Sequence, residues 1–165
     1  MTTQERQKKI ASYGNAYTTL ARGLKKFPKR MWKFKPSEND WSIHELIIHI
    51  ADSEANSYVR CRRFIAESGS VVMGYDGDKW ANDLRYHDQN IADALQLFKW
   101  LRRRSYLLIK DLPDSVWANT VNHSESGVMT MDDWLAIYEA HIPEHLAQMK
   151  RVHAAWRTSK TKNEK

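Results

Sequence analysis

The sequence predicts an all-α protein, a four-helix bundle with long connecting loops. Apolar residues recur at spacings of three and four over four long segments, which is the period of a helix that buries one face. Only 6 Gly and 4 Pro occur among the 165 residues, too few for an architecture of many short strands and turns. This length suits one domain, which we expect over residues 1–158, followed by a polar, frayed tail over 159–165.

The four helices are expected at about residues 4–27, 42–67, 89–110 and 130–157. Two of them begin with a capping box, in which a hydroxyl and a carboxylate satisfy free backbone N–H groups reciprocally. Ser42 and Glu45 form the first box, and Thr130 and Asp133 form the second. These pairs fix where the second and fourth helices start.

The connections over residues 28–41, 68–88 and 111–129 are longer than the roughly 2–8 residues usual between bundle helices. They contain large aromatic residues, so we expect some of them to fold over one end of the bundle. Tyr75 and Trp80 can wall a pocket there or tether their loop.

The charge and cysteine content exclude several classes of protein. One cysteine, Cys61, excludes an internal disulfide and a cysteine zinc cluster. The first residues lack the apolar region of a signal peptide, and no segment approaches the roughly 20 apolar residues of a membrane span, so we expect a cytoplasmic protein without membrane contact. A net charge of +6 permits an anionic partner without requiring one.

Basic residues form several groups along the chain. Because no helix-turn-helix or base-stacking motif accompanies them, a solvated surface is favoured over a nucleic-acid interface. The groups are Lys25-Lys26, Lys29-Arg30, Lys33, Lys35 and Arg102-Arg103-Arg104.

Three of the seven histidines can meet inside the bundle. His141 and His145 are four residues apart in the fourth helix, on the stripe that also carries Trp134, Tyr138 and Met149, so both point inward. In the second helix, at about 100° per residue, a polar strip falls on one face; it consists of His49, Ser53, Asn56 and Arg60. Three inward imidazoles predict a metal site with open coordination positions, the layout of catalytic rather than structural zinc.

Other assignments of these histidines stay open or fail on geometry. An H-x-x-x-H pair also occurs as ordinary surface or core histidines, and Pro143 between the two can kink the helix or be tolerated. His44-Glu45 and His49 resemble the zincin H-E-x-x-H motif with one residue too many, which places the two imidazoles about 140° apart. No Glu-x-x-His pair of a di-iron bundle is present.

Four motifs in order resemble the DinB/YfiT-like bundle proteins, most closely their YfiT branch. They cover roughly residues 35–155 and are Trp41-Ser42-Ile43 through His49 to Arg60, Gly74-Tyr75-Asp76 with Trp80, Asn122 to Gly127, and Tyr138 through His141 and His145 to Leu146. This chain has Ile48-His49 where that branch tends to show His-His, and Ser124 after His123 where Pro is familiar.

The resemblance implies an up-down-down-up bundle, often a homodimer, that holds one divalent metal, zinc or nickel, through His49, His141 and His145. It also implies a small-molecule substrate and either hydrolysis or the transfer of a low-molecular-weight thiol to an electrophile. A metal-binding or stress-related bundle without catalysis, acting through dimerisation or an anionic partner, is the alternative. Nucleic-acid binding is the least favoured.

Three further residues are weak catalytic candidates. His123 can act as an acid or base over the metal, although turn contacts of its own loop explain it better. Asp52 can orient a ligand imidazole or cap a neighbouring loop. Arg60 can bind an anionic substrate, although pairing with a carboxylate is favoured. Cys61, flanked by arginines, is expected to be a packing residue rather than a reactive thiol.

Overall fold

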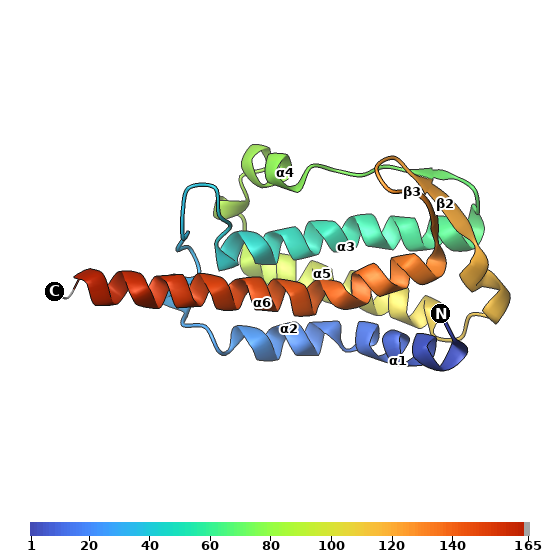
Figure 1. Ribbon diagram of the computed structural model, residues 1–165, viewed down its shortest axis with the longest axis horizontal. Coiled ribbons are helices and arrows are strands. Elements are labelled where there is room, and N and C mark those ends of the chain that lie inside the picture. Colours follow the sequence, from blue (N-terminus) through green and yellow to red (C-terminus); the bar gives the residue numbers. More distant parts are fainter. Residues whose placement is uncertain (164–165) are drawn as a thin grey trace.

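The structure, a computed structural model that describes residues 1–163, consists of four helical rods. Helices α1 (Thr3–Gly14) and α2 (Ala16–Leu24) form the first rod, and α3 (Ile43–Ala66), α5 (Ile91–Ile109) and α6 (Met131–Asn163) form the others. Helices α3 and α5 run in the same direction, and the first rod and α6 run opposite to them (Figure 1). The expected up-down-down-up bundle is therefore confirmed.

Both expected capping boxes are present. The Ser42 hydroxyl accepts a hydrogen bond from the Glu45 amide at 3.2 Å, and the Glu45 carboxylate accepts one from the Ser42 amide at 2.8 Å. Thr130 and Asp133 repeat these contacts at 3.2 and 2.8 Å. Asn90 caps α5, where its side-chain oxygen accepts from the Ala92 amide at 2.8 Å. The starts of α3, α5 and α6 therefore follow from side chains that satisfy free N–H groups.

The first helix differs from the uninterrupted helix expected to Phe27. It breaks at Asn15, and α2 ends at Leu24. The Asn15 side chain donates to the Ala11 carbonyl at 3.0 Å, which competes with the helical backbone pattern. At Gly14, an added Cβ would lie 2.6 Å from the Tyr106 ring, so glycine allows α5 to approach closely.

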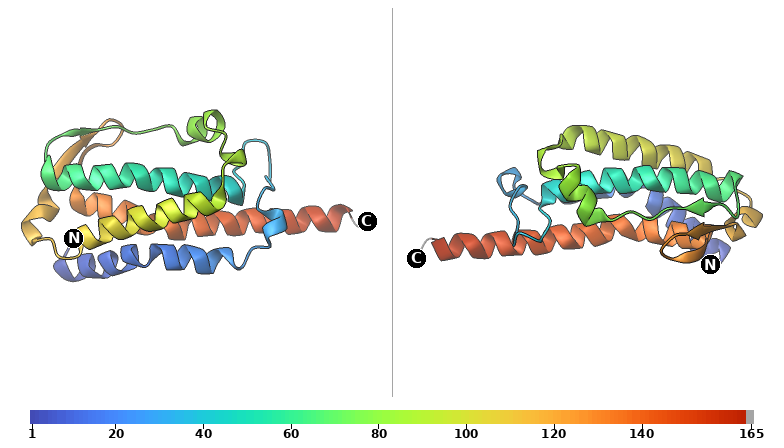
Figure 2. Two further views of the ribbon diagram at one scale, coloured as in Figure 1. Left: turned by 180° about the vertical axis from the view of Figure 1, so that it is seen from behind. Right: turned by 90° about the horizontal axis from the view of Figure 1, so that it is seen from above.

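The last helix is longer than expected. Helix α6 continues past Arg157 to Asn163 and projects beyond the other helices (Figures 1 and 2). Residues 159–163, expected to belong to a frayed tail, are helical in the structure, and residues 164–165 of that tail lie outside the described part. Hydroxyls of this segment donate to backbone carbonyls of the preceding turn, as between Ser159 and Trp156 at 2.8 Å, and leave the helical pattern intact.

A small sheet, which the sequence did not predict, joins two of the long loops. Its strands β1 (Val71–Val72), β2 (Thr120–His123) and β3 (Gly127–Thr130) lie in this order, with β1 parallel and β3 antiparallel to β2. From β1 the chain runs back along α3 to the short helix α4 (Gly77–Asp83), before α5 begins (Figure 1). The long loops therefore cover one side of the bundle as well as its end.

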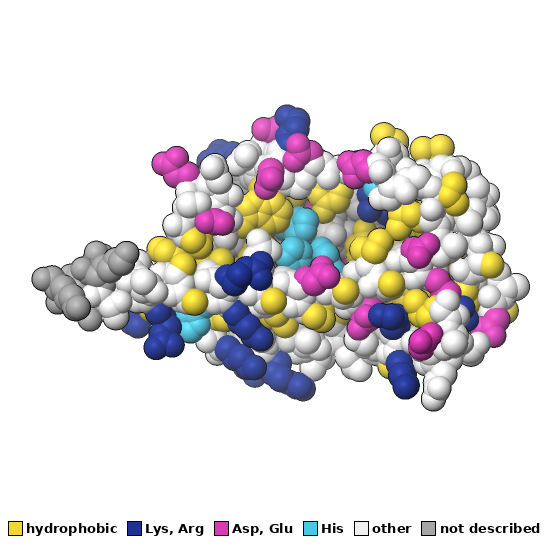
Figure 3. All heavy atoms as spheres, in the orientation of Figure 1, with side chains coloured by type: hydrophobic (Ala, Val, Ile, Leu, Met, Phe, Trp, Pro, Cys, Tyr) yellow, Lys and Arg dark blue, Asp and Glu magenta, His cyan; other side chains and the backbone are white. Residues whose placement is uncertain are grey.

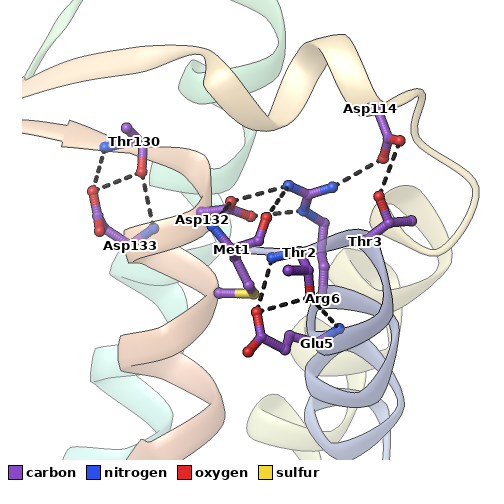
Figure 4. A network of polar contacts seen from close by, with 9 residues as sticks. All are labelled: Met1, Thr2, Thr3, Glu5, Arg6, Asp114, Thr130, Asp132 and Asp133. Carbon is purple, nitrogen blue, oxygen red and sulfur yellow. Dashed lines mark hydrogen bonds and ion pairs between the residues drawn. The ribbon is translucent and has the colours of Figure 1, made fainter.

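Buried arginines tie the rods together. Arg6 of α1 donates to Asp132 of α6 at 2.7 Å and to Asp114, in the 3-10 helix Asp114–Ala118, at 2.9 Å (Figure 4). Arg102 of α5 is 1% exposed and pairs with Glu54 of α3 at 2.6 Å. The basic run that begins at Arg102 therefore does not form one surface patch.

No helix within residues 1–163 is both long and apolar enough to cross a membrane.

Candidate metal centre

Three imidazoles from two helices meet in the middle of the bundle. His49 of α3 and His141 and His145 of α6 each offer one ring nitrogen, and these three atoms all lie within 4.8 Å of one another. The ring centroids of His141 and His145 are 4.4 Å apart, and that of His49 lies 5.5 and 5.0 Å from them. Each ring is partly exposed, and histidine side chains gather in the middle of one face, between the α4 segment and α6 (Figure 3).

The packing of α6 directs its two histidines inward. Trp134, Tyr138, Met149 and Val152 share the stripe and are at most 5% exposed, so the rotation of the helix is fixed on both sides of the pair. The helix continues through Pro143, which lies on the exposed side. His141 and His145 therefore point into the bundle, as their stripe predicted, and Pro143 does not interrupt the helix between them.

Burial keeps these imidazoles neutral. Burial, and then the neighbouring His145, lowers the pKa of His49 to about 3. Burial and the two other imidazoles lower the pKa of His141 to about 2, and burial also lowers the pKa of His145. A neutral ring carries the nitrogen lone pair that a metal ion requires.

Hydrogen bonds orient two of the rings. The Nδ1 atom of His145 lies 3.1 Å from the Gln148 side-chain oxygen, which can only accept, so Nδ1 carries the proton and Nε2 presents its lone pair. Nε2 of His141 lies 3.4 Å from the Ser53 hydroxyl. Gln148 was not predicted as a partner of His145, although its spacing of three on one helix places the two side chains side by side.

The geometry suits a single metal ion. The Nε2 atoms of His141 and His145 are 3.0 Å apart, and two nitrogens at ~2.0–2.1 Å from a tetrahedral ion are about 3.3 Å apart. Nδ1 of His49 is buried, with no hydrogen-bond partner among the described residues. The described residues therefore leave one nitrogen of this ring without the partner that a buried polar atom normally has.

Aromatic side chains close one side of the cluster. The rings of Trp41 and Tyr75 lie 4.7 and 6.3 Å from the His49 ring, and Trp80 lies 4.4 Å from Tyr75. The Trp41 indole donates to Asp78 of α4 at 2.9 Å. Tyr75 therefore walls the site beside His49, and the contacts of Trp80 with Tyr75 and of Trp41 with Asp78 tether α4 over it.

A cleft of about 220 Å³ lies one aromatic residue away from the imidazoles, none of which lines it. Tyr138 lies between the cleft and the imidazole cluster, because it lines the cleft and its ring is 6.0 Å from that of His141. The polar side chains of the cleft come from α3, the segment before α4, the β2–β3 hairpin and α6; they are Arg60, Tyr75, His123, Glu125, Ser126 and Tyr138. The rings of Tyr75 and Tyr138 therefore stand between this cleft and the three imidazoles.

His123 lines this cleft and is also held by its own turn. Its Nδ1 accepts hydrogen bonds from the backbone amides of Glu125 and Ser126 at 3.2 and 3.3 Å. Nε2 therefore carries the proton, and the ring can donate a hydrogen bond but cannot act as a base in this arrangement. Burial and nearby Arg60 lower the pKa of His123, which keeps the ring neutral.

Asp52 and Arg60 differ in part from their expected roles, whereas Cys61 is the packing residue that was expected. The Asp52 carboxylate accepts from the Tyr86 hydroxyl at 2.6 Å, and no contact to a ligand imidazole occurs among the described residues. Arg60 donates to the Tyr138 hydroxyl at 3.0 Å. No carboxylate among the described residues lies within salt-bridge distance of Arg60, so the expected pairing of Arg60 with a carboxylate is wrong. Cys61 is fully buried, and burial raises the pKa of its thiol to about 12.

Comparison with known families agrees with this architecture. The family model of the DinB superfamily matches residues 14–149. The chain belongs to the DinB superfamily.

Relatives of this DinB protein carry names that refer to a metal. A "Putative metal-dependent hydrolase" of Halalkalibacterium halodurans is 32% identical over 115 residues, 70% of this chain and 67% of the relative. A protein of the same description from Oceanobacillus iheyensis is 33% identical, over 66% of this chain and 63% of the relative. The matches thus span about two thirds of the relatives' own length.

A solved structure shares the fold. YfiT from Bacillus subtilis, described as "a probable metal-dependent hydrolase with an unusual four-helix bundle topology", superposes with a TM-score of 0.84 at 20% identity. The match covers 92% of this chain and 87% of YfiT. At this identity the likeness demonstrates the fold alone.

Proposed function

We propose that this chain is a metal-dependent enzyme that acts on a small molecule. His49, His141 and His145 would hold one divalent ion, and the cleft beside them would hold the substrate. The observation that carries the proposal is the convergence of three neutral imidazole nitrogens within 4.8 Å on a partly exposed face. The metal-dependent hydrolase names of the relatives support the same class of reaction and a small substrate.

The donor set suits zinc or nickel. Imidazole nitrogen binds both ions well, and neither a thiolate nor a carboxylate belongs to the cluster. Three protein ligands leave a coordination position open, as in catalytic zinc sites. A dication in this site would lower the pKa of a water molecule or thiol that binds it.

The residues of this chain would prepare the site for that chemistry. Gln148 fixes the tautomer of His145, and Trp41 and Tyr75 exclude water from the side of His49. His123 lines the cleft with its proton on Nε2, and this N–H would orient a polar group of the substrate. Water and a low-molecular-weight thiol would use the same open position, so the cosubstrate decides between hydrolysis and thiol transfer.

The test is a product analysis with the metal-loaded protein. Activated esters and small alkyl electrophiles are offered with and without a low-molecular-weight thiol, and the mass of the product shows which nucleophile was added. We expect turnover that requires the metal and is lost in His141→Ala but kept in His87→Ala, since His87 lies outside the cluster. Turnover unaffected by metal removal would contradict the proposal, and stoichiometric metal without turnover would favour a non-catalytic metal-binding protein.

A further inference from the structure

Arg60 is a half-buried cation that faces the cleft without a counter-ion. Its guanidinium donates to the Tyr138 hydroxyl at 3.0 Å and to the Met73 carbonyl, both neutral acceptors. Among the described residues, no ion pair of 4.0 Å or less includes Arg60. These two bonds use two of the five N–H donors of the guanidinium and hold its plane in place.

The other polar groups of the cleft are mainly neutral donors. His123 carries its proton on Nε2, and Ser126 and Tyr75 add hydroxyls. The one acidic side chain is Glu125, which is exposed, so water screens its charge. Its carboxylate packs against Gly74, where an added Cβ would lie 2.2 Å from the carboxylate carbon.

A path of contacts leads from Arg60 to the imidazoles. Arg60 binds Tyr138, and the Tyr138 ring lies 6.0 Å from His141, while Tyr75 lies 6.3 Å from His49 across the same cleft. The guanidinium therefore lies one aromatic residue away from the metal site, within reach of the far end of a small substrate.

We propose that Arg60 binds an anionic group, a carboxylate or a phosphate, of the substrate whose reactive group lies at the three-histidine site. Arginine suits this role because its planar fork binds either anion through two parallel hydrogen bonds. The donors of His123 and Ser126 complete the subsite. This assignment rests on the proposed function and restricts its substrates to anionic small molecules.

The test uses thiols that can bind the metal at one end and the subsite at the other. Zinc-loaded protein is titrated calorimetrically with ω-mercaptocarboxylates of increasing chain length, the neutral ω-mercaptoamides of the same lengths, and ω-mercaptoalkyl phosphates. At one chain length or more, we expect an acid or phosphate to bind at least tenfold more tightly than the matching amide. The acid and phosphate series together identify which anion the subsite prefers.

Variants separate the subsite from the metal. Arg60→Gln should abolish the preference for the anion with zinc content unchanged, and Arg60→Lys should keep part of it. Glu125→Gln should strengthen anion binding, because it removes a like charge from the rim. Arg63→Gln, one turn along α3 and outside the cleft, is the matched control and should change nothing.

Each outcome assigns a failure to one proposal. Equal affinity for acid, phosphate and amide at every length, with zinc bound, would overturn the anion subsite alone. A preference for the anionic thiol that survives in Arg60→Gln, or that weakens in Glu125→Gln, would overturn it as well. A chain that binds no zinc would overturn the proposed function instead.

Discussion

The Nε2 atoms of His141 and His145 lie 3.0 Å apart, on adjacent turns of α6, and Gln148 holds His145 from the other side of its ring. Gln148 forces the proton onto Nδ1, so Nε2 is left as a lone-pair donor next to that of His141. A partner of this kind fixes both the tautomer and the orientation of a metal ligand.

Gln148→Leu should therefore weaken metal binding by roughly 10- to 100-fold, the usual cost of losing such a partner. Gln148→Glu keeps an accepting oxygen and should retain most of the affinity. Competition with a chromogenic zinc chelator measures both dissociation constants. Equal affinity in Gln148→Leu and the parent would show that Gln148 does not orient His145.

Stability of the metal-free chain should fall as the pH drops below 6.5, the ordinary pKa of histidine. The unfolded chain takes up protons there, whereas in the fold the pKa values of His49 and His141 are lowered to about 3 and 2. At pH 5 each of these imidazoles should therefore lower the free energy of unfolding by about 2 kcal/mol.

Urea denaturation of the metal-free protein at pH 7 and pH 5 measures this loss. His141→Asn removes one of the titrating groups and should reduce the difference between the two pH values. The prediction fails if the parent and His141→Asn lose the same stability between pH 7 and pH 5.

Arg102 and Glu54 form a buried ion pair, each with a side chain 1% exposed. Arg102→Met leaves the Glu54 carboxylate and the Tyr13 hydroxyl bonded to it without their cationic partner. We expect a loss of about 3–5 kcal/mol in the free energy of unfolding. Since Glu54→Leu/Arg102→Met removes both charges, it should cost much less than the sum of the single variants. Strictly additive losses in urea denaturation would mean that the two side chains do not stabilise each other.

Cys61 should be inert to thiol reagents in the native protein. Its side chain is fully buried, and burial raises the pKa of the thiol to about 12 despite the three arginines near it in sequence. Ellman's reagent should label the folded chain only at the rate of unfolding and label the urea-unfolded chain completely. Stoichiometric labelling of the native protein within minutes would contradict this.

The features that the sequence predicted have a local motif or a regular period in the sequence. Capping boxes defined the starts of α3 and α6, and the three-residue and four-residue period directed His141 and His145 inward. Helical geometry accounts for the inward direction of each histidine on its own helix. That His49 of α3 meets the pair on α6 depends on how the two helices pack, which the family resemblance implied and the periodicity did not.

The features it missed depend on contacts between distant segments. Strands of two to four residues, such as β1, are too short for an alternating pattern. Arg102 appears in a run of three arginines typical of a surface, and only the position of Glu54 on α3 explains its burial. The cleft likewise could not be predicted, because its walls come from α3, the β2–β3 hairpin and α6.

The central claim is that His49, His141 and His145 share one metal ion, and elemental analysis of protein purified without chelator tests it most directly. We predict about one zinc or nickel per chain, lost in each of His49→Ala, His141→Ala and His145→Ala and kept in His87→Ala. Absence of metal in the parent, with no uptake from added zinc or nickel, would contradict the account, as would full metal content in any of the three cluster variants.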